Sequence, residues 1–366
     1  MLKITRSLAA AGLFEEIHLV GICEEGLSEH EQLDGKRFIW RVPLNKPLPI
    51  PKMRGFLKFM QWCVKILGRY YGKDISVIHC HSLTDLPIGV LLKIGKKKAR
   101  LVYDAHELET ERNGLTGINK RLAKLKERAL IRFVDQVLVV SDSIAEWYRQ
   151  MYRNSSVTVV KNIPYNDGPS LDGPDGSAFK NRFSIEGGIV FLYQGALMRG
   201  RGIDLLLKTF SRVRGDKHIV FMGYGSYEQK IKEFAASHAN IHFHEAVSPD
   251  EVLRYTAGAD VGICLIENTC LSYYYSLPNK LYEYTLAGMP VIVSQFPEMA
   301  RLVRQFGNGW DTVVQEEHIL SLVDQIDPPS IEAKKRNAIK ARESIGWHLE
   351  EKKLLGAYQL LSNGAL

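Results

Sequence analysis

Asn279, Lys280 and Glu283 fall within the first two turns of one short predicted helix, and their side chains suit a single ligand. A helix N-terminus presents free N–H donors and a partial positive charge, which favour a phosphate group. Lys280 adds a full positive charge, and the Glu283 carboxylate, one turn further on, could accept hydrogen bonds from two ribose hydroxyls. These residues predict a nucleotide-diphosphate site; an ordinary amphipathic helix is the alternative interpretation.

The sequence around these residues predicts the elements that hold them. The stretch from residue 275 to 294 reads YSLPNKLYEYTLAGMPVIVS. Pro278 fits the first helical turn, where its missing N–H costs nothing. Gly288 can end the helix in a left-handed conformation, and Pro290 prevents it from continuing. The apolar run that follows is typical of a parallel strand covered on both faces.

The segment from Ser276 to Ile292 resembles the donor-site signature of the large family of retaining, nucleotide-sugar-dependent glycosyltransferases with the GT-B fold. That family carries Glu-x7-Glu followed by an A/Y-x3-G-x-P-V-I run. Glu283 matches the second Glu, and the run from Tyr284 onward matches the tail, whereas Tyr275 occupies the position of the first Glu. Bacterial polysaccharide-assembly members similarly read S-L-P-N-K-L-x-E-Y. The resemblance implies an α/β fold of two Rossmann-like domains facing across a cleft, with a C-terminal helix crossing back.

Three further segments resemble the same family. The strand 189–195 and the glycine-rich turn 196–202 match a strand and its basic phosphate clamp in that family. Arg201 matches the later basic position of the clamp. Ala196 stands where many relatives place an Arg, and Arg199 is expected to compensate for it. Residues 219–225 are predicted to form a strand with a glycine turn, and strand 241–247 matches the one whose end usually borders the base of the donor. Residues 101–107 are predicted to form a strand and its outgoing loop, and their Asp-Ala-His-Glu segment resembles the family's loop whose histidine, here His106, lines the sugar site. The resemblance implies the catalytic residues His106, Arg201 and Lys280 and the donor-binding residues Gly195, Arg199, Gly223, Val247, Ser276, Leu277, Pro278, Asn279 and Glu283.

We predict an N-terminal acceptor-binding domain over residues 1–165, a Gly- and Pro-rich linker over 166–186, a donor domain over 187–345 and the crossing helix over 346–366. Family members usually begin with a strand and a glycine-rich loop. This sequence instead starts with a predicted helix over 2–12 and a strand over 16–23. The first strand of the N-terminal domain is therefore expected to be absent.

Composition indicates a globular cytoplasmic protein. Of 366 residues, 45% are hydrophobic and 24% charged. We find no apolar run of about 18 residues and no signal-peptide pattern. The five cysteines include no CxxC pair, which suits buried thiols in a reducing compartment.

The basic excess lies entirely in the N-terminal half. Residues 1–165 hold 27 Lys and Arg against 17 Asp and Glu, a charge of +10, and the remainder is −3. Two segments, 53–71 and 119–133, combine basic with apolar residues. They are read either as solvated helix faces or as a surface that binds anionic lipid on the inner face of the plasma membrane, with Phe59 and Trp62 entering the headgroups. We expect no nucleic-acid partner.

We expect neither a metal ion nor another cofactor. His79 and His81 end the predicted strand 75–82, but no third ligand is spaced near them in the sequence, and no Asp-x-Asp motif occurs. Activity should therefore persist in excess EDTA.

The resemblance implies a retaining glycosyltransferase that moves a sugar from a nucleotide-sugar to a glycan or polyprenyl-linked acceptor in cell-surface polysaccharide synthesis. Two alternatives stay open. A nucleotide-sugar 2-epimerase shares the fold, and Tyr275 together with the absent first strand favours a catalytically inactive assembly partner.

Overall fold

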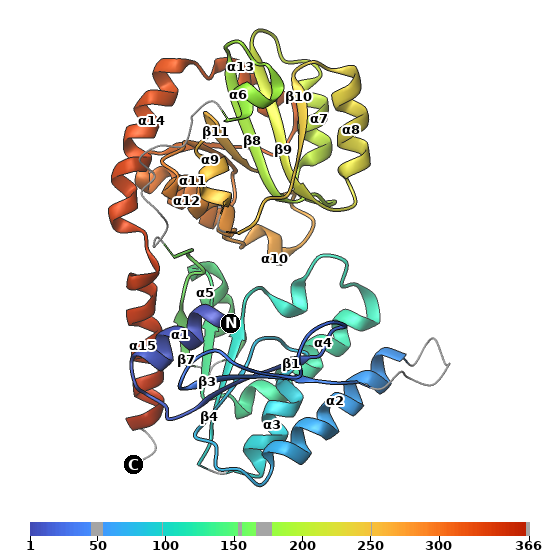
Figure 1. Cartoon of the computed structure of the whole chain (residues 1–366), viewed down its shortest axis with the longest axis vertical. Coiled ribbons are helices and arrows are strands. Elements are labelled where there is room, and N and C mark those ends of the chain that lie inside the picture. Colours follow the sequence, from blue (N-terminus) through green and yellow to red (C-terminus); the bar gives the residue numbers. More distant parts are fainter. Residues whose placement is uncertain (45–53, 97, 153–155, 166–177, 250, 364–366) are drawn as a thin grey trace.

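The computed structural model describes residues 1–44, 54–96, 98–152, 156–165, 178–249 and 251–363. Figure 1 shows two α/β domains stacked along the long axis, with a helical column beside both. Hydrophobic side chains form separate cores in the two domains. Both domains combine β-sheets with covering helices, one sheet in the C-terminal domain and two in the N-terminal domain.

The C-terminal domain is built on one six-stranded parallel sheet with the order β10-β9-β8-β11-β12-β13. Its strands are β8 (Ile189–Ala196), β9 (Lys217–Tyr224), β10 (Ile241–Glu245), β11 (Val261–Cys264), β12 (Val291–Ser294) and β13 (Gly309–Thr312). Counted along the chain, this is the doubly wound order 3-2-1-4-5-6. Such sheets bind ligands beyond the carboxyl ends of their strands, where the order reverses, which here is between β8 and β11.

Helices cover both faces of this sheet. They are α6 (Ala178–Phe183), α7 (Ile203–Phe210), α8 (Glu228–Ser237), α9 (Val252–Thr256), α10 (Leu271–Tyr274), α11 (Asn279–Leu286), α12 (Pro297–Phe306), α13 (Glu316–Gln325) and α14 (Pro328–Ala341). α11 ends as predicted, because Gly288 takes a left-handed conformation with φ of 72°. Pro278, in contrast, is the N-cap of α11 and lies outside the helix, with an extended ψ of 143°.

The N-terminal domain contains two sheets. One has the order β1-β3-β2, and the other is the parallel sheet β4-β5-β6-β7. The strands are β1 (Ile17–Ile22), β2 (His30–Gln32), β3 (Arg37–Val42), β4 (Val77–Cys80), β5 (Arg100–Ala105), β6 (Gln136–Val139) and β7 (Ser156–Val159). The helices are α1 (Leu2–Ala10), α2 (Arg54–Tyr70), α3 (Leu86–Ile94), α4 (Gly117–Leu130) and α5 (Asp142–Met151).

The last helix returns to the N-terminal domain. α15 (Trp347–Asn363) follows α14 down one side of the molecule (Figure 1). Its buried residues Trp347, Leu354 and Tyr358 pack with Ile4 and Leu8 of α1. The Trp347 indole donates a hydrogen bond to the Ser7 hydroxyl at 2.8 Å. The end of the chain thus fixes α1 against β5 and β6.

The two domains also touch directly. The Ser143 hydroxyl and backbone N–H of α5 donate to Glu298 of α12 at 2.6 and 2.8 Å. Arg301 pairs with Asp142 at 2.6 Å. Residues 166–177 of the predicted linker and the prolines at 47, 49 and 51 lie outside the described residues. In the part of the chain that is described, no helix has both the length and the apolar character needed to span a bilayer.

Candidate active site

Two glycines open the carboxyl edge of the C-terminal sheet. Gly195 at the end of β8 and Gly223 at the end of β9 are partners in register and have φ of 109° and 157°. A Cβ on Gly223 would lie 1.9 Å from the Gly195 carbonyl oxygen, so only glycine fits there. A Cβ on Gly195 would meet nothing within 4 Å, so the space beside it is open. Glycine is favoured at this position by its positive φ, which other residues rarely adopt.

Arg201 and Lys280 bring two positive charges to this edge. The Lys280 ammonium lies 3.7 Å from the centre of the Tyr193 ring, and the Arg201 guanidinium lies 4.9 Å from that of Tyr273. Burial lowers the pKa of Lys280 to about 8; Cys264 and Glu283 act against this shift, whereas the charge of Arg201 adds to it. The two cations are therefore within electrostatic reach of each other.

Neither cation has an acidic partner. Among the described residues neither Arg201 nor Lys280 forms an ion pair with a carboxylate, and Arg201 Nε is buried without a hydrogen-bond acceptor. Protein anions normally neutralise buried cations, because an unpaired buried charge is costly. Two adjacent cations that form no ion pair, with Glu283 acting on Lys280 only from beyond 4 Å, are the arrangement expected where a bound ligand supplies the negative charge.

The loop that carries Arg201 is fixed by Glu267. Gly202 N–H donates to the Glu267 carboxylate at 3.2 Å, and Glu267 N–H donates to the Gly200 carbonyl at 3.0 Å. Gly202 has φ of 73°, and a Cβ there would lie 2.9 Å from Leu265 Cβ. This loop places the Arg201 guanidinium against Tyr273 of α10, within electrostatic reach of Lys280 at the start of α11.

Glu283 has a protein partner that sequence reasoning missed. Gln194 Nε2 donates to Glu283 Oε2 at 2.6 Å, and Gln194 Oε1 accepts a hydrogen bond from the Thr256 hydroxyl at 2.7 Å. Burial raises the pKa of Glu283, while Gln194 and Lys280 oppose this shift in part. One carboxylate oxygen is therefore occupied, and only Oε1 is free of a protein hydrogen bond in the described structure. In the sequence, the one indication of this role of Gln194 is that it directly precedes Gly195.

The remaining donor-binding candidates differ in position. The Ser276 hydroxyl donates to the Tyr273 carbonyl at 2.7 Å, Leu277 is buried, and Asn279 is exposed at the start of α11. Arg199 is exposed and makes no ion pair or hydrogen bond with any described residue, so the structure does not show it compensating for Ala196. Val247 lies two residues beyond β10 and packs into the domain core.

In the N-terminal domain, three histidines surround Asp104. Its Oδ2 atom lies 3.3 Å from His79 Nε2, 3.2 Å from His81 Nδ1 and 3.5 Å from His106 Nε2. Burial alone would raise the pKa of Asp104, but the hydrogen bonds from His79 and His81 outweigh it and hold the pKa far below its usual range. Burial lowers the pKa of His106, which is the most exposed of the three. Tyr358 of α15 hydrogen-bonds His79 Nδ1.

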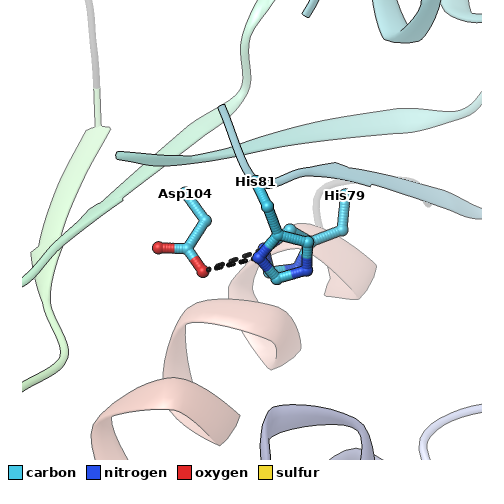
Figure 2. Close-up of side chains that lie close together, drawn as sticks. All are labelled: His79, His81 and Asp104. Carbon is cyan, nitrogen blue, oxygen red and sulfur yellow. Dashed lines mark hydrogen bonds and ion pairs between the residues drawn. The ribbon is translucent and has the colours of Figure 1, made fainter. Parts of the chain in front are cut away.

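This cluster corrects the sequence-based statement that no third ligand lies near the two histidines. Ligand-type atoms of His79, His81 and Asp104 all lie within 4.8 Å of one another. The two imidazoles, however, are stacked, with centroids 4.3 Å apart and planes at 20°, as their overlap in Figure 2 shows. Each ring places a nitrogen 3.2–3.3 Å from the same atom, Asp104 Oδ2, so the carboxylate lies where the two nitrogens converge. The observed arrangement is therefore that of imidazoles bound to a carboxylate.

The cluster is connected to the donor domain through its own loop. Glu107, next to His106, accepts a hydrogen bond from the Ser272 hydroxyl of α10 at 3.1 Å. The following residue, Tyr273, is the one that stacks with Arg201. The histidine loop and the phosphate clamp are thus attached to the same short helix.

An N-terminal α/β domain and a doubly wound C-terminal domain, in contact through the histidine loop of the first and the helix α10 of the second, are the architecture of the GT-B class. Family models that match the two domains identify the family within this class. Residues 188–327 match the family described as glycosyl transferases group 1, and residues 1–163 match glycosyltransferase family 4. The chain is a glycosyltransferase and belongs to this GT-B family.

Solved structures agree with this fold. Sucrose-phosphate synthase from Thermosynechococcus elongatus superposes with a TM-score of 0.78 at 15% identity, covering 99% of this chain and 92% of that one. Anabaena HepE in complex with UDP-glucose gives 0.68 at 14% identity, covering 88% and 85%. WaaG, a glycosyltransferase involved in lipopolysaccharide biosynthesis, gives 0.66 at 16% identity, covering 96% and 93%. No curated protein matches this chain in sequence.

Proposed function

We propose that this glycosyltransferase uses a nucleotide-sugar donor and retains the configuration at the transferred anomeric carbon. The observation that carries the donor assignment is the pair Arg201 and Lys280, two neighbouring cations that form no ion pair with a described carboxylate, at the switch point of a doubly wound sheet. A nucleoside diphosphate supplies two or more negative charges to such a pair. The HepE complex with UDP-glucose supports testing uridine nucleotides first.

The proposed chemistry is departure of the nucleoside diphosphate. Negative charge grows on the leaving diphosphate as the glycosidic bond breaks, and fixed cations that meet this charge lower the barrier. Arg201, Lys280 and the N–H groups at the start of α11 would do so without a metal ion. Glu283 would hold a ribose hydroxyl through Oε1, and His106 would orient the sugar from the opposite domain.

The test is a thermal-shift screen against UDP-, GDP-, ADP- and dTDP-sugars, followed by NMR analysis of the anomer produced from the donor that binds. A product with the donor's anomeric configuration supports retention, and inversion refutes it. Formation of a 2-epimer without an acceptor would identify an epimerase instead. Absence of binding to all four donors would reject the nucleotide-sugar proposal.

Tyr275 favours one second candidate, a catalytically inactive assembly partner. Its side chain packs against the N-terminal core, and its carbonyl accepts a hydrogen bond from Ser141 at 3.0 Å. The residue at the first Glu position of the motif thus serves the contact between the domains. Tight donor binding with neither hydrolysis nor transfer, across a panel of glycan and lipid-linked acceptors, would favour this candidate.

We further propose that the enzyme acts on a lipid-linked acceptor in cell-surface polysaccharide synthesis, at an anionic membrane on the cytoplasmic side. The support is an apolar and basic surface on α2 and α4. Each helix exposes an apolar stripe at a helical spacing, formed by Phe56, Met60 and Val64 on α2 and by Ile118, Leu122 and Leu125 on α4. Phe56 is 60% exposed and Leu125 is 65% exposed, values that mark interaction surfaces when they recur over neighbouring helices. α3 contacts both helices, so all three belong to one side of the domain.

This surface differs from the one expected from sequence. Trp62 is buried and Phe59 is only partly exposed, because both face the core. On α4, Lys120 and Lys124 pair with Glu111 at 2.5 and 2.6 Å. The charge available to lipid phosphates is therefore smaller than the residue count suggests, and the apolar stripes gain importance in the proposal.

A further inference from the structure

Helix α10 packs against the cores of both domains. Leu271 and the C-cap Tyr275 contact the core of the N-terminal domain, whereas Tyr273 and Tyr274 pack into that of the C-terminal domain. Residues four positions apart lie on the same face of a helix, so one face of α10 meets each domain. Figure 1 shows α10 at the boundary between the two domains. The position of this helix therefore depends on contacts with both.

A buried hydroxyl attaches α10 to the histidine loop. The Ser272 side chain is only 2% exposed, and its hydroxyl donates to Glu107 Oε2 at 3.1 Å. The other oxygen of this carboxylate, Oε1, lies 3.8 Å from the Arg112 guanidinium. A buried hydroxyl that loses its partner is costly, because it has already given up its hydrogen bonds to water. Glu107 therefore fixes α10 against the histidine loop.

The next residue of α10, Tyr273, holds the guanidinium of Arg201. The guanidinium lies over the ring, 4.9 Å from its centre. The same ring approaches the backbone of the loop that carries Arg201, because a Cβ built on Gly200 would lie 3.2 Å from Tyr273 Cε2. A cation over an aromatic face is attracted by the ring quadrupole and is not neutralised by it. The ring thus orients Arg201 and leaves its positive charge available to an anion.

The backbone and the side chain of Arg201 are held by different residues. Glu267 forms hydrogen bonds with the backbone of Gly200 and Gly202, on either side of Arg201. Those bonds do not select a rotamer for the long side chain, and arginine loses much conformational entropy when one rotamer is imposed. Arg201 Nε is buried without an acceptor, so no hydrogen bond at that atom imposes one either. The contact with the Tyr273 ring takes this role.

We propose that Tyr273 is a positioning residue for Arg201, and that Glu107 holds Tyr273 in place through Ser272. The histidine loop of one domain thereby sets the geometry of a cation in the other. Such positioning matters, because a displacement of about 1 Å at a reacting group can cost about a hundredfold in rate. The inference rests on the proposed function, since it concerns the clamp for the same diphosphate.

Two matched pairs of variants test the two contacts. Tyr273→Phe keeps the ring and Tyr273→Leu removes it. Glu107→Gln keeps an oxygen acceptor for Ser272 and Glu107→Ala removes it, while Ser272→Ala removes the same hydrogen bond from the other side. Circular dichroism selects the variants that fold.

Two measurements need no sugar donor. The first is the NMR signal of the Arg201 Nε–H group, identified by its absence from Arg201→Ala, because the ring current of Tyr273 shifts this signal. The second is calorimetric titration with inorganic pyrophosphate. A failed screen of nucleotide-sugars would therefore reject the proposed donor and leave the test of Tyr273 and Glu107 intact.

We expect Tyr273→Leu, Glu107→Ala and Ser272→Ala to move the Arg201 signal and to weaken pyrophosphate binding by about tenfold, whereas Tyr273→Phe and Glu107→Gln stay within about twofold of the wild type. In the Arg201→Ala background, Tyr273→Leu should weaken binding no further, because its effect acts through Arg201. Wild-type affinity in Tyr273→Leu, or an additive loss in that background, would overturn the role of Tyr273. An unmoved Arg201 signal in Glu107→Ala or Ser272→Ala would overturn the link to the histidine loop.

Discussion

Gln194 Nε2 donates a hydrogen bond to Glu283 Oε2 at 2.6 Å, joining residues on β8 and α11. The bond fixes the rotamer of the carboxylate and leaves Oε1 as its one available acceptor. A carboxylate accepts a stronger hydrogen bond when it is ionised. Burial of Glu283 opposes ionisation, whereas the hydrogen bond from Gln194 and the charge of Lys280 favour it.

Glu283→Gln should weaken binding of a nucleoside diphosphate by roughly tenfold, since a hydrogen bond to a charged group contributes about 1.5–3 kcal/mol. Calorimetric titration with the nucleotide and its 2′,3′-dideoxy analogue gives a double-mutant cycle. The wild type should discriminate between the two ligands, and the variant should not. Equal discrimination by both proteins would separate Glu283 from the ribose.

Arg201→Ala and Lys280→Ala should each lower kcat by on the order of a hundredfold, because each removes about 3 kcal/mol of stabilisation from the departing diphosphate. Steady-state kinetics with the donor found in the screen measures this. Lys208→Ala is the matched control, since Lys208 is exposed on α7. Wild-type turnover in either clamp variant would remove that residue from the mechanism.

Affinity for the nucleoside diphosphate should fall as the pH rises above about 8. Burial lowers the pKa of Lys280 from 10.5 to about 8, so the ammonium that meets the phosphate is lost in this range. Titrations from pH 6.5 to 9.5 should show up to about tenfold weaker binding per pH unit on the alkaline side. Lys280→Arg stays charged and should bind with little dependence on pH. A flat profile in the wild type would contradict the role of Lys280.

The lowered pKa of Lys280 has the opposite pH dependence in the stability of the ligand-free protein, which should increase with pH. A lysine whose folded pKa lies below its unfolded value destabilises the fold while it is charged. Between about pH 8 and 10.5, Lys280 is protonated in the unfolded chain and largely neutral in the folded protein. The free energy of unfolding therefore increases as the pH rises through that window. Comparing Tm of wild type and Lys280→Met across the window isolates the contribution.

Transfer activity should be unchanged in excess EDTA, because Arg201 and Lys280 supply the positive charge at the diphosphate. The assay is transfer before and after chelation, with Mg²⁺ and Mn²⁺ added back separately. An absolute requirement for either ion would show that the two cations do not suffice.

The protein should float with vesicles containing phosphatidylglycerol at low salt and dissociate at high salt, because surface charges are screened within about 10 Å at 0.1 M salt. The double variant Phe56→Ser, Leu122→Ser should lose this binding. Leu360→Ser, which changes a 73% exposed residue of α15, serves as control. Binding to neither kind of vesicle would return this surface to a solvated face, and equal binding to both would show that its basic residues do not select an anionic membrane.

Local sequence signals determined the elements that form the site. Within residues 275–294, Gly288 ends helix α11 in a left-handed conformation, and a continuous apolar run forms the buried strand β12. Ser141 caps α5 by accepting a hydrogen bond from Ile144 N–H, three residues further along the chain. These features depend on interactions between residues a few positions apart, so the sequence alone contains the information.

Only the tertiary structure decided which side chains meet. Lys280 lies over Tyr193 and Gln194 holds Glu283 because the sheet order places β8 beside β11 and next to α11. Asp104 joins His79 and His81 because β4 and β5 are adjacent in register. Helical spacing gave α2 an amphipathic pattern but did not fix its rotation, and packing on the sheet buried Trp62 while exposing Phe56. Such pairings join residues distant in the chain, and their geometry is set by strand order and core packing rather than by any local preference.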